Sequence, residues 1–170
     1  MNKINIDLDE KLVKYIKEKC GKDITSDIEI IIKTALDEKN INGENVSISI
    51  SAVSKDEIHK INKEYRNVDR PTDVLSFPIF SREEIDNFCN LEEEKKVKEM
   101  ELGDIIICID ILQEHAQEYN TGILREMLYM ITHGVCHLLG YDHEIKEEKE
   151  QMRELEEKIL EKIGVGRIDG

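Results

Sequence analysis

The sequence predicts an α+β domain, a mixed-sheet layered fold built from four short strands and five or six helices. Alternating or continuous β-branched segments indicate strands at residues 3–8, 46–50, 74–77 and 102–109. Segments with helical periodicity separate and follow these strands. One of them, residues 123–139, is apolar on nearly all sides, which predicts a helix buried in the middle of the domain. Strands and helices in this order are typical of α+β layered folds.

The N-terminal part is expected to form a strand, two helices and a second strand. Apolar residues recur at helical spacing over residues 9–20, and Gly21 provides a stop signal. A second helix buries apolar positions between Ile28 and Leu36. Apolar residues then alternate with serines from Val46 to Ile50, so this strand should bury one face only.

The middle of the chain joins a helix to an edge of the sheet through a polar loop. Ser54 and Glu57 have the spacing of a capping box, which predicts a helix starting there. Pro71 keeps the following loop, residues 66–73, from becoming helical. Residues 81–100 are highly charged, and we expect a solvated, mobile insertion loop that is at most partly helical.

The last two helices should differ in burial. The helix over residues 123–139 is expected to be the most protected element of the fold, where side chains can be held rigidly. Residues 144–163 form a highly charged amphipathic helix that is expected to cover the outside of the domain, with a dimer contact as the alternative.

Length and composition indicate one domain spanning residues 1–170. The net charge of −14 argues against broad, sequence-independent nucleic-acid binding, so DNA is not an expected partner. Residues 55–70 nevertheless carry five Lys/Arg against four Asp/Glu, which leaves room for a local basic cleft. No apolar run reaches transmembrane length, and the start of the chain has no signal-peptide pattern. Four widely spaced cysteines without a C-x-x-C pair predict free thiols in a reducing cytoplasm.

Three histidines within eleven residues predict a metal site. His133 and His137 are four apart and lie on one face of a helix. Gly140 allows a sharp turn that would return His143 toward them. Three imidazoles with an open fourth position suit Zn²⁺, one per chain, although nickel, copper or iron would also fit.

Several residues around this site have two interpretations. Cys136 is either a small buried core residue or a further metal contact, and Asp142 is either a turn residue or the partner of a ligand's second nitrogen. Arg66 is either a phosphate contact, a surface arginine, or an arginine paired with Asp69. His59 and His115, not named among the ligands, are expected to be ordinary surface residues.

The H-x-x-x-H-x-x-G-x-x-H spacing is shared with the metzincin proteases, but one residue argues against their chemistry. In those enzymes a glutamate follows the first histidine and acts as general base, whereas here Gly134 occupies that position. A peptide hydrolase of that mechanism is therefore not expected.

The block from His133 to His143 resembles the signature of the YbeY-type endoribonucleases, which are bacterial ribosomal RNA maturation factors. Tyr65–Pro78 matches a second block of that family, and Leu102–Ile105 matches a third. The resemblance runs in the right order from about residue 45 to residue 143. Cys136 stands where many family members have leucine.

This resemblance implies a metal-dependent, single-strand-specific RNA hydrolase that matures the 3′ end of small-subunit ribosomal RNA and takes part in ribosome quality control. It implies a zincin-like fold, with a mixed four-stranded sheet and helices around a central ligand-bearing helix. By carry-over, His133, His137 and His143 bind zinc, and Arg66 is the functional arginine. The small ribosomal subunit and assembly factors are the implied partners, and no membrane is expected.

Two alternatives stay open at this point. One is a metal hydrolase acting on another substrate, such as a peptide. The other is a non-enzymatic ribosome-assembly factor in which a fourth ligand closes a structural zinc site.

Overall fold

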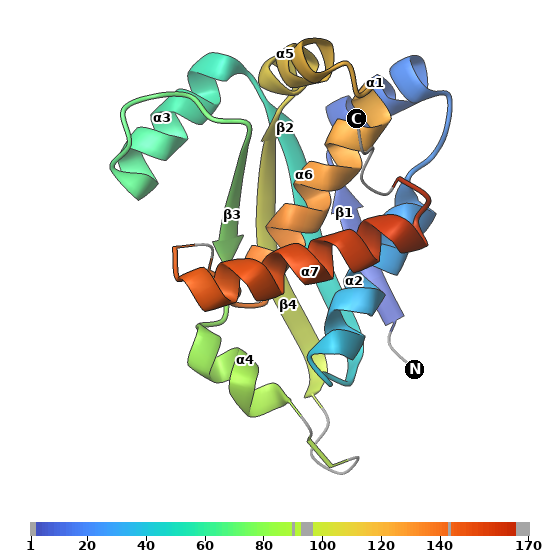
Figure 1. Ribbon diagram of the computed structural model, residues 1–170, viewed down its shortest axis with the longest axis vertical. Helices are drawn as coiled ribbons and strands as arrows, with labels where there is room; N and C mark the ends of the chain where they lie inside the picture. The colour runs from blue at the N-terminus through green and yellow to red at the C-terminus, as the bar shows by residue number, and fades with distance from the viewer. Residues whose placement is uncertain (1–2, 90, 93–96, 143, 166–170) are drawn as a thin grey trace.

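The structure is a computed structural model, and it describes residues 3–89, 91–92, 97–142 and 144–165 (Figure 1). Within these residues it contains four strands and seven helices, one helix more than the largest number expected. The elements are β1 (Lys3–Leu8), α1 (Glu10–Cys20), α2 (Thr25–Glu38), β2 (Gly43–Val53), α3 (Lys55–Arg66), β3 (Val74–Pro78), α4 (Arg82–Phe88), β4 (Val97–Cys108), α5 (Ile109–Tyr119), α6 (Ile123–Leu138) and α7 (Lys146–Lys162).

The four strands form one mixed sheet in the order β1-β2-β4-β3. β1 pairs with β2, and β2 with β4, in parallel, whereas β3 runs antiparallel to β4 at the edge. The helices between these strands provide the crossovers that parallel pairing requires. Ile105 in β4 lies opposite Ile50 on one side and Ser76 on the other. The prediction of an α+β fold with a mixed four-stranded sheet is confirmed.

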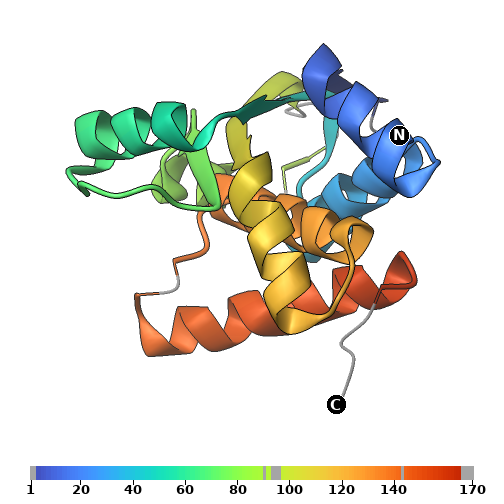
Figure 2. The same cartoon turned by 90° about the horizontal axis from the view of Figure 1, so that it is seen from above.

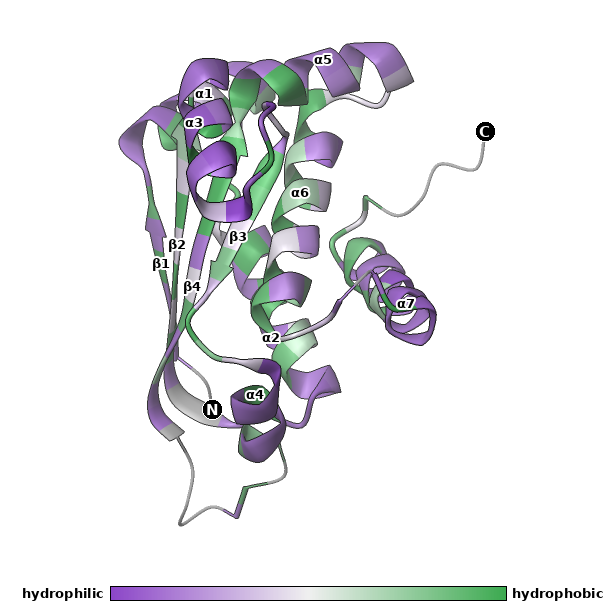
Figure 3. Cartoon of the chain, turned by 90° about the vertical axis from the view of Figure 1, so that its left-hand side faces the viewer, coloured by the Kyte–Doolittle hydropathy of each residue, from purple (hydrophilic) through white to green (hydrophobic). Residues whose placement is uncertain are grey.

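Helix α6 lies between the sheet and α7. Figure 3 shows α6 along one face of the sheet, with α7 on its far side and its polar surface turned outward. The main core joins all three layers, and its members include Ile105, Ile107, Met127, Ile131, Val135, Met152, Leu155 and Ile159. Burying each such side chain contributes about 1.5–3 kcal/mol. The predicted burial of the central helix and the outer position of the last helix are therefore confirmed.

Gly134 lies where α6 packs against the sheet. A Cβ atom built on Gly134 would lie 2.7 Å from Cδ1 of Ile105. Ile105 is itself completely buried, so it has no open space to move into. A side chain at position 134 would thus point into the sheet, which gives a packing reason for glycine after the first histidine.

Helix α3 attaches to the sheet through a smaller second core. Ile58 of α3 packs there with Leu75, Cys108 and Ile111, from β3, β4 and α5. The predicted capping box is present, since the Ser54 side chain accepts from the Glu57 N–H and the Glu57 side chain accepts from the Ser54 N–H. Figure 2 shows α3 and the loop that follows it projecting beyond the β3 edge of the sheet.

The segment over residues 81–100 is partly helical, as predicted, but part of it is buried and its end belongs to the sheet. Residues 82–88 form α4, and β4 already begins at Val97. Ile85 is completely buried in the main core, and Arg82 forms an ion pair with Glu148 of α7. The high charge of the segment concealed one buried apolar position and a second capping box, formed by Ser81 and Glu84. Residues 90 and 93–96 lie outside the described residues.

None of the helices in the described ranges is both long enough and apolar enough to cross a lipid bilayer.

Candidate active site

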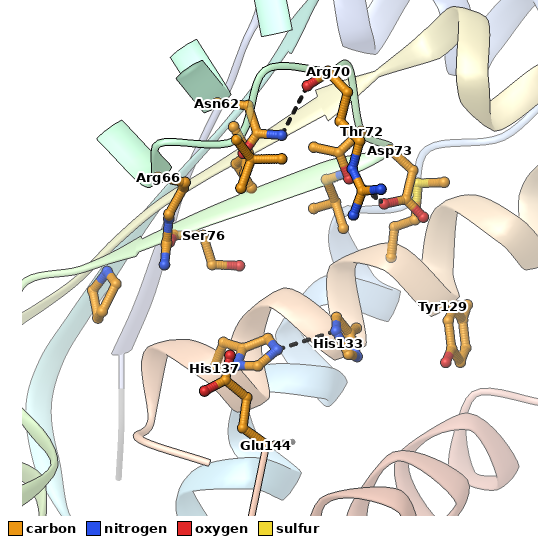
Figure 4. Close-up of a pocket in the computed structure, with 15 residues that line it drawn as sticks. Asn62, Arg66, Arg70, Thr72, Asp73, Ser76, Tyr129, His133, His137 and Glu144 are labelled. Atoms are coloured by element: carbon orange, nitrogen blue, oxygen red, sulfur yellow. Dashed lines mark hydrogen bonds between the residues drawn. The ribbon is translucent and has the colours of Figure 1, made fainter. Parts of the chain in front are cut away.

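A cleft of about 630 Å³ separates α6 from the α3–β3 segment (Figure 4). One wall is formed by side chains from α3, the loop that follows it and β3. The other wall includes Met130 and Glu144 and, spaced one turn apart on α6, Tyr129, His133 and His137. In Figure 4, Arg66 and Arg70 reach into the cleft from the wall opposite the two histidines. Helix α6 therefore brings His133 and His137, two of the predicted metal ligands, to the same cavity as Arg66, the predicted phosphate contact.

His133 and His137 point their outer ring nitrogens at each other. The two Nε2 atoms are 3.1 Å apart, and the rings meet nearly at right angles, at 83°. This follows from the four-residue spacing, which stacks the two side chains on successive turns of α6. The predicted convergence of these two histidines is confirmed.

The inner nitrogens of both rings face hydrogen-bond acceptors. His133 Nδ1 lies 2.9 Å from Oε2 of Glu156, and His137 Nδ1 lies 3.0 Å from the carbonyl oxygen of Tyr141. An acceptor at each Nδ1 selects the tautomer with hydrogen on that atom, so each Nδ1–H donates. In neutral imidazoles of this tautomer the two Nε2 lone pairs then converge on one point.

Two converging lone pairs repel unless a cation or a proton lies between them. Two nitrogens bound to one tetrahedral Zn²⁺ at about 2.0–2.1 Å would be roughly 3.3–3.4 Å apart. The separation of 3.1 Å between the Nε2 atoms is close to that value. The donor set and its geometry therefore fit a divalent metal of the zinc type.

The third predicted ligand, His143, lies outside the described residues, so the three-histidine site stays a prediction. Among the residues that the structure does describe, no three His, Cys, Asp or Glu side chains form a metal-binding group.

The turn that was expected to return the chain after α6 is present. Gly140 has a φ of 91°, and its N–H donates to the His137 carbonyl at 3.0 Å. The N–H of Tyr141 donates to the Cys136 carbonyl at 3.2 Å, which completes a Schellman motif. The same turn places the Tyr141 carbonyl at the His137 ring. Asp142 acts as a turn residue, because its Oδ1 accepts from the Glu144 N–H at 2.9 Å.

Cys136 fits the core interpretation. The side chain is completely buried in the main hydrophobic cluster. Burial raises the pKa of its thiol well above the usual range, which disfavours the thiolate form that binds metals.

Arg66 is held at the edge of the cleft by β3. Its guanidinium donates to the Ser76 carbonyl and lies over the Phe77 ring, 5.3 Å from the ring centroid. The alternative that Arg66 pairs with Asp69 is wrong. Asp69 pairs instead with His59 at 2.8 Å, and the hydrogen bond from His59 lowers the pKa of the Asp69 carboxyl. A guanidinium has five N–H donors, so one bond to Ser76 leaves others for a ligand.

Sequence reasoning missed three residues at this site. Arg70 lines the cleft, and its backbone carbonyl accepts from the Asn62 side chain at 2.9 Å, which fixes the loop. Tyr129 is 40% exposed and stacks on His133 with an interplanar angle of 18°. Its position one turn before His133 was a usable signal, whereas nothing in the sequence linked Glu156 to the site.

His115 was expected to be an ordinary surface residue, but it contacts the wall of the cleft. Its Nδ1 lies 3.7 Å from Oδ2 of Asp73, a residue of the cleft wall. Asp73 also accepts from the Val74 N–H at 2.8 Å, a contact that holds the entry to β3.

The chain is similar in sequence to several known proteins. The family model described as "Endoribonuclease YbeY" matches residues 12–164. Relatives described by the same words are found in Thermoanaerobacter sp. (strain X514), 42% identical over 82% of this chain and 87% of that protein, and in Clostridioides difficile (strain 630), 40% identical over 95% and 92%. A solution structure of TM1509 from Thermotoga maritima is 28% identical over 99% of this chain and 97% of that one, with a TM-score of 0.48.

Proposed function

This chain belongs to the YbeY endoribonuclease family, and from that premise we propose that it is a zinc-dependent endoribonuclease of ribosomal RNA maturation. The proposed substrate is single-stranded RNA, in particular the 3′ end of small-subunit ribosomal RNA. We place this activity in the cytoplasm, on the small ribosomal subunit and its assembly factors, with a role in ribosome quality control. We also propose that the fold is zincin-like, with α6 as the ligand-bearing helix.

One observation supports this proposal above all others: histidine side chains and arginine side chains face each other across a single cleft. Two imidazole Nε2 atoms converge at 3.1 Å on α6, and Arg66 and Arg70 line the facing wall. A phosphodiester between these walls would meet metal ligands on one side and permanent positive charge on the other. This arrangement offers both a site of nucleophile activation and a site that stabilises charge on phosphate.

Within this proposal, His133 and His137 hold the zinc ion and His143 is its third ligand. A bound zinc ion would supply Lewis-acid activation of water at neutral pH. Arg66 binds the scissile phosphate through the N–H groups that it does not use on Ser76, and it stabilises the extra negative charge of the transition state.

The local charge explains how an acidic protein binds RNA here. Of the five basic residues over 55–70, Arg66 and Arg70 line the cleft. Lys55 pairs instead with Glu114 at 2.8 Å, on the outside of α3. The exposed ring of Tyr129 adds an aromatic surface on which an unstacked base can lie. Two arginines, which are permanently charged, thus line the groove of a chain whose net charge is −14.

The geometry also disfavours the peptide hydrolase alternative. The position of the missing metzincin glutamate, Gly134, faces Ile105 in the sheet, with only 2.7 Å available to a Cβ atom. A glutamate at this position would be driven into the core and away from the cleft.

The test combines metal removal with Arg66→Ala. Cleavage of a single-stranded RNA by the wild type should require zinc, and it should stop after chelation and return when zinc is restored. Arg66→Ala should bind zinc normally but cleave roughly 10²–10³-fold more slowly, because it loses a transition-state contact. Lys60→Ala, an exposed cation on the same helix outside the cleft, is the matched control and should retain full activity.

The two parts of the proposal can fail separately. Full cleavage in the presence of a strong chelator would reject the metal requirement. Cleavage by Arg66→Ala at the rate of Lys60→Ala would reject the phosphate contact.

A further inference from the structure

Glu156 is an acidic residue of α7 buried beside the cleft. The residue is 8% exposed, and its Oε2 lies 2.9 Å from Nδ1 of His133. A carboxylate removed from water costs several kcal/mol unless it is well hydrogen-bonded, so such a residue needs a partner. Its partner here is the inner ring nitrogen of His133.

The packing of α7 holds this carboxylate in place. Leu155 and Ile159, next to it in sequence or one turn away, are buried in the main core against α6. Figure 3 shows that α7 crosses outside α6, on the side away from the sheet. The carboxylate therefore reaches His133 from a separate helix whose position is set by hydrophobic contacts.

We propose that Glu156 is a positioning residue, which holds His133 in the Nδ1–H tautomer and aims its Nε2 into the cleft. This inference rests on the proposed zinc site. A carboxylate on the second nitrogen of a metal-bound histidine fixes the orientation of the ring and increases its basicity. His137 has a neutral backbone carbonyl, from Tyr141, in the equivalent place. At their Nδ1 atoms the two histidines therefore contact different groups, a carboxylate at His133 and a backbone carbonyl at His137.

The test uses Glu156→Ala and Glu156→Gln in the full chain, with Glu154→Gln as the matched control. Glu154 lies on the same helix and is exposed, so its substitution changes the net charge equally without touching His133. Zinc affinity is measured by competition with a chromophoric chelator. Loss of the carboxylate should weaken zinc binding about 10–100-fold in Glu156→Ala. Glu156→Gln should lose less, because its amide oxygen still accepts from Nδ1–H.

A second measurement does not depend on the metal. Nitrogen NMR of the zinc-free protein at about pH 8.5, well above the usual histidine pKa of about 6.5, reports the tautomer of each neutral imidazole. His133 should be Nδ1–H in the wild type, in Glu154→Gln and in Glu156→Gln, and should shift toward Nε2–H in Glu156→Ala. A residue that only stabilised the fold would leave this tautomer unchanged.

The outcomes separate the two proposals. If the wild type binds zinc and Glu156→Ala binds it equally tightly, the positioning role is overturned while the metal site stands. If the wild type binds no zinc, the proposed cofactor is wrong, and the tautomer of His133 in Glu156→Ala alone decides the role of Glu156. Should Glu156→Ala fail to fold, wild-type affinity in Glu156→Gln would overturn the contribution of its charge.

Discussion

Gly134→Ala adds one methyl group where α6 rests on the sheet. The new Cβ would lie 2.7 Å from Ile105 Cδ1, 3.0 Å from its Cγ1 and 3.2 Å from its Cγ2. All three distances are shorter than the normal contact of about 3.5–4.0 Å between carbon atoms. Ile105 is completely buried, so either its side chain leaves its rotamer or the helix moves outward.

Two opposing effects set the magnitude. Alanine in the middle of a helix is favoured over glycine by about 0.5–1 kcal/mol. Inserting a methyl group into a packed core costs about 1–3 kcal/mol. The overpacking term is larger, so Gly134→Ala should lower the free energy of unfolding by about 1 kcal/mol, although helix propensity alone predicts a gain.

Urea unfolding with a double-mutant cycle measures the overpacking energy between position 134 and Ile105 directly. Ile105→Val removes the methyl group closest to the new Cβ, and by itself it should cost about 0.5–1.5 kcal/mol. The Gly134→Ala/Ile105→Val pair should be more stable than the sum of the single changes by about 1 kcal/mol. Ile107→Val, equally buried on the same strand, is the control and should show a smaller coupling.

A stabilised Gly134→Ala protein would refute this reasoning, because it would mean that α6 does not press on β4 at this point. Equal coupling energies with Ile105→Val and Ile107→Val would also contradict it. In either case the packing explanation for the missing glutamate would have to be abandoned.

Two further predictions concern the end of α6 and the buried thiols. Gly140→Ala should lower the free energy of unfolding by about 1–2 kcal/mol, since φ is 91° and the added Cβ would lie 3.3 Å from Arg82 Cα. It should also weaken zinc binding by displacing the Tyr141 carbonyl; chemical denaturation with chelator competition measures both effects, and an unchanged protein would contradict the role of this turn. Alkylation followed by mass spectrometry should find Cys108 and Cys136 protected on the order of 10³-fold or more relative to the two half-buried cysteines, because burial keeps the reagent from both thiols and also raises the pKa of Cys136 well above its usual range. Rapid labelling of Cys136 in the native protein would place it outside the core.

Features that depend only on residues close together in the sequence could be predicted from local patterns. The Ser54–Glu57 capping box, the alternation in β2 and the four-residue spacing of His133 and His137 each involve residues within one or two turns or along one strand. The segment over residues 81–100 was misjudged for the same reason. Its overall charge was read correctly, but the burial of Ile85 depends on a core formed by distant elements.

The class of the fold, the central helix and the helix face shared by two histidines could all be predicted from the order of residues, because periodicity and spacing act through covalent neighbours. The residues that surround those histidines could not be predicted in this way and depend on the folded arrangement. Arg70, Asp73 and Glu156 reach the site through the packing of α3, β3 and α7 against α6, and the partner of Asp69 proved to be His59. Contacts between segments far apart in the chain depend on how apolar faces pack together, and no local pattern carries that information.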